Sequence, residues 1–271
     1  MVLLARLWWG DIQAVQETPV THPIRRLSFA FASVAILGAL GGCAYNDTLG
    51  RSQLLLFDDA TLTQQADLAW AEALRTQPTS RDAALNARVK RVGDRVVQAA
   101  GLAGARTWEY AVFVNDSPNA FVLPSGKIGV TTSLLALVRN DDQLAAVLGH
   151  EVGHVVARHA AERSSNTAVA GVGLSVLQGA AGDYGQAVGS IGGLAAQYGV
   201  LLPYSRRDEL EADRLGVDYM QAAGYRPAES VALWRLMSAQ RQGSTPEFAS
   251  THPSDQTRIA QLEAYIQSRG W

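Results

Sequence analysis

The spacing of apolar residues along the chain predicts a mainly helical protein. Apolar positions recur at helical intervals over 61–76 and 83–100, separated by Pro78-Thr79-Ser80. The same period predicts helices over 133–138, from Asn140 to about Ala161, from Ser205 to about Gly224, and over 227–241 and 254–268. In the second helix the apolar stripe is best read as core-facing.

The pattern changes to a period of two between residues 107 and 132. Trp108–Val114, Asn119–Leu123 and Lys127–Thr131 are typical of three short strands separated by turns. We therefore expect an α+β, mainly α fold, with a small antiparallel β-sheet just before the helix that begins at Asn140. An edge strand of that sheet could pair with an extended polypeptide, and a plain structural meander is the alternative.

Residues 165–202 are rich in Gly, Ala, Val and Leu and divide at Gly182-Asp183-Tyr184. Neither half is a continuous uncharged run of the ~20 residues that a membrane span needs. We expect a packed helical hairpin, and contact with a membrane surface or a hydrophobic client is the alternative.

Composition adds little to this picture. The chain has 271 residues, of which 48% are apolar and 18% charged, as expected for a globular protein with a sizeable core. The net charge of −2 gives no argument for nucleic acid binding. Cys43 is the only cysteine, so no disulfide can form within one chain.

Residues 25–43 resemble a bacterial lipoprotein signal. Arg25 and Arg26 precede an uncharged run from Leu27 to Leu40 that is too short for a membrane span and ends in Leu-Gly-Gly-Cys. The resemblance implies cleavage before Cys43 and lipidation of this residue, with several acyl chains giving stable anchoring. Ala44, and not Asp, follows the cysteine. In Gram-negative bacteria this resembles the default pattern of lipoproteins sorted to the outer membrane. A short buried helix with a chance cysteine is the alternative, and the poor fit of residues 1–24 suggests a later translation start, for example at Val20.

The sequence His150-Glu151-Val152-Gly153-His154 carries the candidate chemistry. Residues four apart lie on one helix face, so His150 and His154 can bind one metal ion with Glu151 beside its open side. Two imidazole ligands and a general base are the arrangement of zinc peptidases. A surface helix with two solvated histidines is the alternative. His159 falls on roughly the opposite face of the same helix and is interpreted as structural.

A hydrolytic zinc site needs a third protein ligand and an open position. Positions 157 and 160 are both Ala, which excludes one common pattern with a third histidine. Glu209 is the candidate, on a helix that Ser205 and Asp208 can cap. Asp213 shares its face and can fix the free N–H of a ligand histidine, most simply His150. The alternative is a solvated acidic helix face.

These residues, together with Thr251-His252-Pro253 and Arg258-Ile259, resemble the gluzincin family of zinc metallopeptidases. That family includes HtpX, the CAAX prenyl proteases and BepA. If the chain is a short lipoprotein with one catalytic domain, as expected, it most resembles the LoiP-like periplasmic members of the family. The segment Asn119-Ala120-Phe121 resembles the substrate-edge strand of the family, although Pro-Ser-Gly follows here where Pro-Gly-Gly is common.

The resemblance implies one Zn²⁺ per chain and roles for further residues. Glu151 would act as general base, and Asn119, Ala120 and Phe121 would bind substrate. His252 would stabilise the oxyanion, or alternatively act as a fourth ligand that displaces the water. Arg258 is expected to be a structural partner.

The expected function is a zinc-dependent endopeptidase that is lipid-anchored at the periplasmic face of the outer membrane in a Gram-negative bacterium. Its substrates would be misfolded or unassembled envelope proteins, and the outer-membrane assembly machinery is a further partner to consider. The expected division is a removed extension and signal (1–42), a lipid-anchored tether (43–60) and a metallopeptidase domain (61–271). One alternative is a non-proteolytic chaperone or assembly factor with a latent metal site, which the intact Glu151 disfavours. An aminopeptidase is disfavoured because no Gly-x-Met-Glu-Asn-type segment is present.

Overall fold

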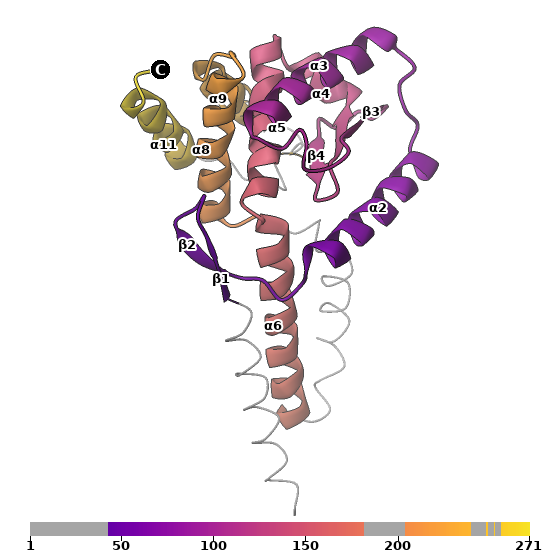
Figure 1. Ribbon diagram of the computed structural model, residues 1–271, viewed down its shortest axis with the longest axis vertical. Helices are drawn as coiled ribbons and strands as arrows, with labels where there is room; N and C mark the ends of the chain where they lie inside the picture. The colour runs from indigo at the N-terminus through magenta and orange to yellow at the C-terminus, as the bar shows by residue number, and fades with distance from the viewer. Residues whose placement is uncertain (1–42, 182–203, 240–247, 249–251, 253–255) are drawn as a thin grey trace, which may run out of the picture. The chain divides into compact units, whose positions relative to one another are not determined.

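A computed structural model describes residues 43–181, 204–239, 248, 252 and 256–271, with side chains described up to Gly171 and from Tyr204 onward (Figure 1). The expected signal and the second half of the Gly/Ala-rich region lie outside the described residues. All described residues belong to one compact unit that begins at Gly42. Figure 1 shows a body of helices around a small three-stranded sheet, together with a separate two-stranded hairpin.

Helix α5 (Asp141–Val156) lies at the centre of this body. It begins where the Asn140 side chain accepts from Gln143 N at 2.8 Å, as the sequence predicts for an N-cap. Every residue from Gln143 to His154 is buried, so α5 is a core helix enclosed on all sides. Its neighbours are α3 (Ala83–Ala99), α8 (Arg206–Ala222), α9 (Ala228–Ala239) and the sheet, and α11 (Gln256–Ser268) packs on α8 and α9.

The main sheet has the strand order β3-β5-β4, with β3 (Glu109–Phe113), β4 (Ala120–Leu123) and β5 (Lys127–Thr131). β4 and β5 are antiparallel, but β3 and β5 are parallel, so the sheet is mixed and the expectation of a purely antiparallel sheet was wrong for this pair. The chain crosses from β3 to the far side of β5 before the turn at Gly126 (φ 87°) returns it to the centre. β4 is therefore an edge strand, and it contacts α5.

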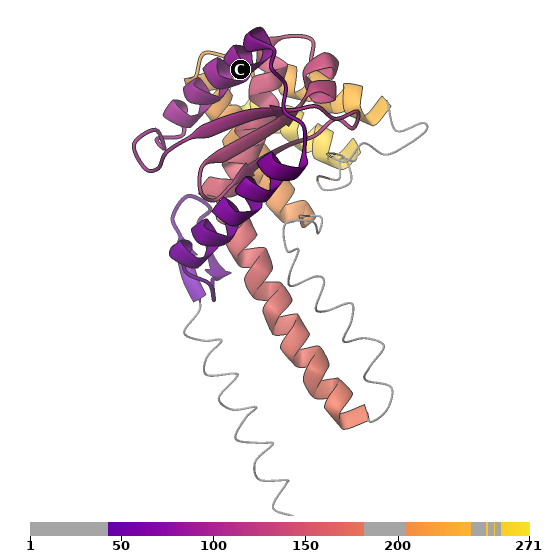
Figure 2. The ribbon, with the colours of Figure 1, turned by 90° about the vertical axis from the view of Figure 1, so that its right-hand side faces the viewer.

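Both faces of this sheet are covered. Helix α2 (Asp59–Thr76) crosses one face (Figure 2). There the Trp70 ring meets Phe113 and Phe121 edge-on. Side chains on the other face join the main core formed with α3 and α5. The short helix α4 (Thr132–Leu137) follows β5 directly and leads into α5.

The first described residues form an ordered hairpin. β1 (Cys43–Asn46) and β2 (Arg51–Leu54) are antiparallel, with Gly50 (φ 66°) at the turn. Polar side chains of the hairpin bind residues of α6 and α8, and the expected role of residues 43–60 as a lipid-anchored tether stays a prediction.

Helix α6 (His159–Ala181) does not continue α5, since Arg158 between them adopts φ 56°. Left-handed backbone is unusual at a residue with a side chain and ends the regular helix there. Among the helices of the described ranges, none combines the length and apolar character that crossing a bilayer would require.

Candidate metal centre

Three glycines bring α5 and α8 into close contact. A Cβ atom at Gly149 would lie 2.9 Å from Gly216 O, and one at Gly153 would lie 2.8 Å from Ala212 O. A Cβ atom at Gly216 would meet His150 N at 2.8 Å. Such distances leave no room for side chains, so the two backbones touch at this crossing. Side chains from α8 are thereby placed directly over the histidines of α5.

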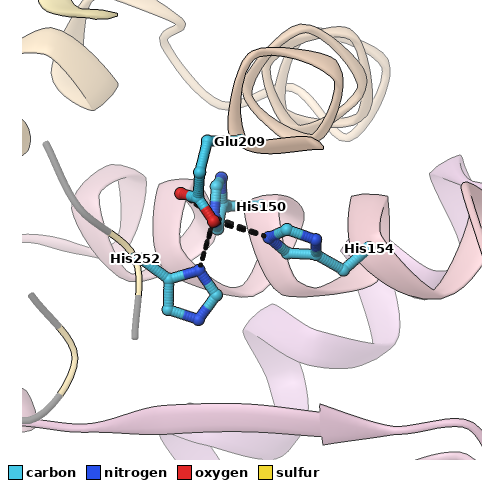
Figure 3. Close-up of side chains that lie close together, drawn as sticks. All are labelled: His150, His154, Glu209 and His252. Carbon is cyan, nitrogen blue, oxygen red and sulfur yellow. Dashed lines mark hydrogen bonds and ion pairs between the residues drawn. The ribbon is translucent and has the colours of Figure 1, made fainter. Parts of the chain in front are cut away.

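Four side chains converge at the crossing (Figure 3). One ligand atom each from His150, His154, Glu209 and His252 lies within 4.8 Å of the others, and all four residues are buried. His150 Nε2 is 3.1 Å from His154 Nε2 and 3.2 Å from His252 Nδ1. Glu209 Oε1 is 3.0 Å from His252 Nδ1 and 3.4 Å from His154 Nε2. The three residues expected as ligands are therefore brought together, with His252 as a fourth.

The electrostatics of this group favour a cation. Burial lowers the pKa of His150, but the charge of Glu209 and the hydrogen bond to Asp213 outweigh it and raise the pKa to about 9. Burial holds the pKa of His154 well below its ordinary value, so this ring keeps a lone pair. A divalent ion that binds imidazoles replaces their protons. Nitrogen and carboxylate donors in a buried cluster suit zinc, so the residues present fit the metal that the sequence pattern implies.

Glu151 lies beside this group and not within it. Its Oε1 is 3.2 Å from His252 Nε2, and the residue is 4% exposed. Burial raises the pKa of Glu151. The charge of His252 and a hydrogen bond from the backbone N–H of Val122 in β4 lower this pKa but do not cancel the effect of burial. A buried carboxyl group with a raised pKa is suited to accept and release a proton.

His150 is held by a carboxylate and an arginine. Its Nδ1 lies 2.9 Å from Asp213 Oδ1, the contact that the sequence predicts. Arg258 of α11 is 1% exposed and donates from Nε to Asp213 Oδ2 at 2.6 Å. Its Nη1 lies 2.5 Å from Glu209 Oε2, and its guanidinium stacks on Trp234. Arg258 is therefore a structural partner of two acidic residues at the site.

His154 is held differently, by a residue that sequence analysis placed on the wrong face. The interruption at Arg158 changes the rotation of the chain between α5 and α6, and His159 Nδ1 lies 2.9 Å from His154 Nδ1. His159 Nε2 in turn lies 2.9 Å from Glu211 Oε2, and the ring is fully buried. The opposite-face argument for His159 assumed a continuous helix, and no simple sequence signal marks left-handed backbone at an arginine.

The cleft beside Glu151 runs along the edge strand. A cavity of about 430 Å³ is lined by β4 and by Asn119, Glu151, Tyr204 and His252. The expected substrate residues Asn119, Ala120 and Phe121 all line it, although the Ala120 side chain is only 2% exposed. Contact with a ligand at Ala120 would therefore be made through its backbone.

Aromatic rings that sequence analysis did not select surround the histidines. Tyr204 stacks on His154 with centroids 3.9 Å apart, and Phe248 stacks on His252 at 4.6 Å. Trp234 meets His150 edge-on at 5.5 Å. These rings come from separate segments; in the sequence, Tyr204 precedes Glu209 by five residues and Phe248 precedes His252 by four.

Comparison with known proteins agrees with this geometry. The model of peptidase family M48 matches residues 83–266, which include all four converging side chains. The chain is similar to mitochondrial metalloendopeptidase OMA1 of Schizosaccharomyces pombe, with 38% identity over 180 residues that cover 66% of this chain and 52% of that protein. It is also similar to metalloendopeptidase OMA1, mitochondrial, of Homo sapiens (29% over 284 residues, 96% and 54% covered).

A bacterial relative is the beta-barrel assembly-enhancing protease of Escherichia coli strain K12. It is 29% identical over 206 residues, which cover 73% of this chain and 42% of that protein. The chain thus spans about half the length of the curated relatives it matches.

Proposed function

This chain belongs to peptidase family M48, and from that premise we propose that it is a zinc-dependent metalloendopeptidase. The observation that carries the proposal is the buried convergence of two imidazoles and a carboxylate beside a protonatable Glu151. His150, His154 and Glu209 would hold one Zn²⁺ per chain, with Asp213 orienting His150. Zinc, when bound by these residues, supplies Lewis acidity toward water and a peptide carbonyl.

Glu151 is proposed as the general base and acid. It takes a proton from the attacking water in the cleft and passes it to the amine of the leaving peptide. A Glu151→Gln variant would keep the ligands and the fold while losing this proton transfer. We expect a decrease in the rate of cleavage of about 10²- to 10⁴-fold, with the zinc content unchanged.

His252 has two proposed roles that one variant separates. Its Nδ1 lies within the ligand group while its Nε2 faces Glu151, which favours His252 as a fourth ligand covering the open position in this conformation. In that role, His252→Ala increases peptidase activity. If His252 instead stabilises the oxyanion, the same change lowers kcat by about 10²- to 10³-fold.

The β4 edge is the proposed contact for the substrate backbone. An extended polypeptide can add to an exposed strand edge through main-chain hydrogen bonds, with Asn119, Ala120 and Phe121 at the start of the contact. Recognition through the main chain suits unfolded segments of many sequences. We propose misfolded or unassembled envelope proteins as substrates, and the name of the E. coli relative, a beta-barrel assembly-enhancing protease, supports a connection with β-barrel assembly.

Digestion of casein and of an unfolded outer-membrane protein by the full chain tests the proposed activity. Cleavage should stop on addition of a chelator, return with Zn²⁺, and be absent from the Glu151→Gln variant. Binding of unfolded protein without chelator-sensitive cleavage would instead support the chaperone alternative.

We also propose that the mature chain is lipid-anchored through Cys43 at the periplasmic face of the outer membrane. The support is the signal-like sequence before Cys43 and the exposed position of this residue at the start of β1. The mitochondrial relatives point to a different compartment. Mass spectrometry of the mature chain separates the two, since an acylated N-terminal Cys43 supports the anchor and an unmodified cysteine contradicts it.

A further inference from the structure

The β1–β2 hairpin caps the end of α5. Gln53 is 2% exposed and donates from Nε2 to Ala157 O at 2.8 Å and to Glu162 Oε2 at 2.7 Å. Asn46 donates to Gln53 Oε1 at 2.8 Å, which fixes the orientation of the Gln53 amide. The last carbonyls of a helix lack partners within the helix. The hairpin therefore satisfies a backbone group three residues beyond His154.

Arg51 of this hairpin binds two carboxylates at once. Its Nε and Nη2 each lie 2.7 Å from an oxygen of Glu211 in α8. Its Nη1 and Nη2 each lie 2.8 Å from an oxygen of Glu162 in α6. Both contacts are bidentate, which is the strongest and most directional geometry for a guanidinium. Arg51 thus fixes the position of Glu211 from outside the helical core.

Glu211 continues this contact to the candidate metal ligand. A carboxylate bound by Arg51 can only accept, so at 2.9 Å it receives the Nε2–H of His159. His159 Nδ1 is then left as an acceptor for the Nδ1–H of His154 at 2.9 Å. His154 consequently keeps the lone pair on Nε2, the atom that faces the ligand group. Each proton position follows from the preceding contact.

The same cluster also has the composition of a second metal site. His159, Asp208 and Glu211 offer ligand atoms within 4.8 Å of one another. The Arg51 guanidinium, however, is bound to both Glu211 oxygens and lies 3.8 Å from Asp208 Oδ1. A metal ion would have to displace this cation from the same oxygens. The geometry therefore favours a positioning role over a second metal.

We propose that Arg51, Glu211 and His159 form a positioning relay that sets the tautomer and orientation of His154, so that the contact of Arg51 with Glu211 controls how tightly the chain binds zinc. The inference rests on the proposed function, because it takes His154 to be a zinc ligand. It connects the segment at Cys43, where we propose the membrane anchor, to the metal site through side chains alone. None of the three residues would touch the substrate.

A matched pair of variants in the full chain tests the relay. Glu211→Ala and Glu162→Ala each remove one of the two carboxylates bound by Arg51, but only Glu211 contacts His159. The readouts are zinc affinity, by competition with a chromophoric chelator, and the visible spectrum of the Co²⁺-substituted protein. Thermal unfolding in excess chelator measures the purely structural effect of each change.

We expect Glu211→Ala to weaken zinc binding by about 10- to 100-fold and to alter the Co²⁺ spectrum. Glu162→Ala should change zinc affinity by less than about threefold, because Arg51 keeps both hydrogen bonds to Glu211 and the contacts from Glu211 to His154 stay in place. Equal weakening by both variants, or wild-type affinity in Glu211→Ala, would overturn the relay. Binding of two zinc ions by the wild type and one by Glu211→Ala would overturn it in favour of a second metal site.

His159 provides a second test that does not depend on the folding of Glu211→Ala. Asn at position 159 can place its side-chain oxygen near the position of Nδ1 and still accept from His154, whereas Ala cannot. Zinc affinity should therefore fall further in His159→Ala than in His159→Asn, and equal affinities contradict the relay. A wild-type chain that binds no zinc would overturn the proposed function together with the relay, whereas tight binding in the wild type and in every variant overturns the relay alone.

Discussion

The two histidines of α5 are held by supports of different construction. Behind His150 stand Asp213 and Arg258, which are 4% and 1% exposed and belong to α8 and α11. Behind His154 stands His159, which is buried, followed by Glu211 and Arg51, whose side chains are each 18% exposed. Both supports end in an arginine bound to a carboxylate. One of these arginines lies in the helical core, and the other comes from a hairpin at the start of the described chain.

This difference separates two kinds of stability. Buried charges that lose a partner are strongly destabilising, because the remaining charge is left without solvent or counter-ion. Partly exposed ion pairs contribute much less, since water can replace a lost partner. His150 should therefore lose its position only when the chain unfolds, whereas the contacts that hold His154 can be weakened while the chain stays folded. The four predictions below test this contrast, beginning with the largest effect.

Arg258→Met should give the largest loss of stability. Methionine has a similar volume but leaves Glu209 and Asp213 buried without the cation that pairs with both. We expect the free energy of unfolding to fall by about 3–5 kcal/mol. Urea unfolding in excess chelator measures this without a contribution from zinc. Arg235→Met is the control, because Arg235 is an exposed partner of Glu263 on α11; a loss for Arg258→Met no larger than in this control would contradict the buried-cluster argument.

Gly216→Ala tests the helix crossing that both supports share. The new methyl group would lie 2.8 Å from His150 N and 3.0 Å from Gly149 C, so α5 and α8 must separate. We expect a loss of about 1–3 kcal/mol in the free energy of unfolding, together with weaker zinc binding as Glu209 moves away. Gly171→Ala in α6 is the matched control, since a Cβ atom added at Gly171 would meet nothing within 4 Å. Unchanged zinc affinity in Gly216→Ala would show that the crossing tolerates a side chain.

Local patterns in the sequence were sufficient for the starts of the two helices that meet at the site, but not for the end of α5, which was expected near Ala161 and lies at Val156. The N-cap of α5 at Asn140 and the capping box of Ser205 and Asp208 are confirmed, because each depends on residues three apart. The face shared by Glu209 and Asp213 follows from the same helical period. Periodicity of this kind constrains neighbouring residues whatever the rest of the fold does.

Contacts between distant segments could not be predicted in this way. Arg51 and Glu211 are 160 residues apart in the chain, and nothing in the local sequence pairs them. The parallel pairing of β3 with β5 depends on the path of the chain around the sheet. The φ of 56° at Arg158 is a local feature, but glycine, the residue that usually indicates it, is absent there. His159 was misplaced for that reason.

Glu162→Gln should reveal the hairpin support through its pH dependence. Burial raises the pKa of Glu162, but Arg51 and Gln53, with Arg207 from α8, hold it below the ordinary value of 4.5. A lowered pKa means that the carboxylate stabilises the fold above pH 4.5 and loses this effect as the pH falls through the lowered value. In thermal unfolding measured from pH 7 downward, the wild type should have a higher melting temperature than Glu162→Gln at neutral pH. This difference in melting temperature should shrink below pH 4.5. A constant difference across this range would mean that the charge of Glu162 is not what stabilises docking.

Arg207→Ala should have the smallest effect, although Arg207 lies in the same cluster. Its side chain is 54% exposed, and its contacts with Glu162 and Asp208 are 3.1 and 3.2 Å long. Arg51 already binds Glu162 through two hydrogen bonds, so that carboxylate stays neutralised when Arg207 is removed. We expect a change of less than about 0.5 kcal/mol in the free energy of unfolding. Zinc affinity, measured by chelator competition, should equal that of the wild type. A loss comparable to that of Glu162→Gln would mean that the exposed edge of the cluster holds the hairpin, and the contrast between Arg51 and its neighbours would then be wrong.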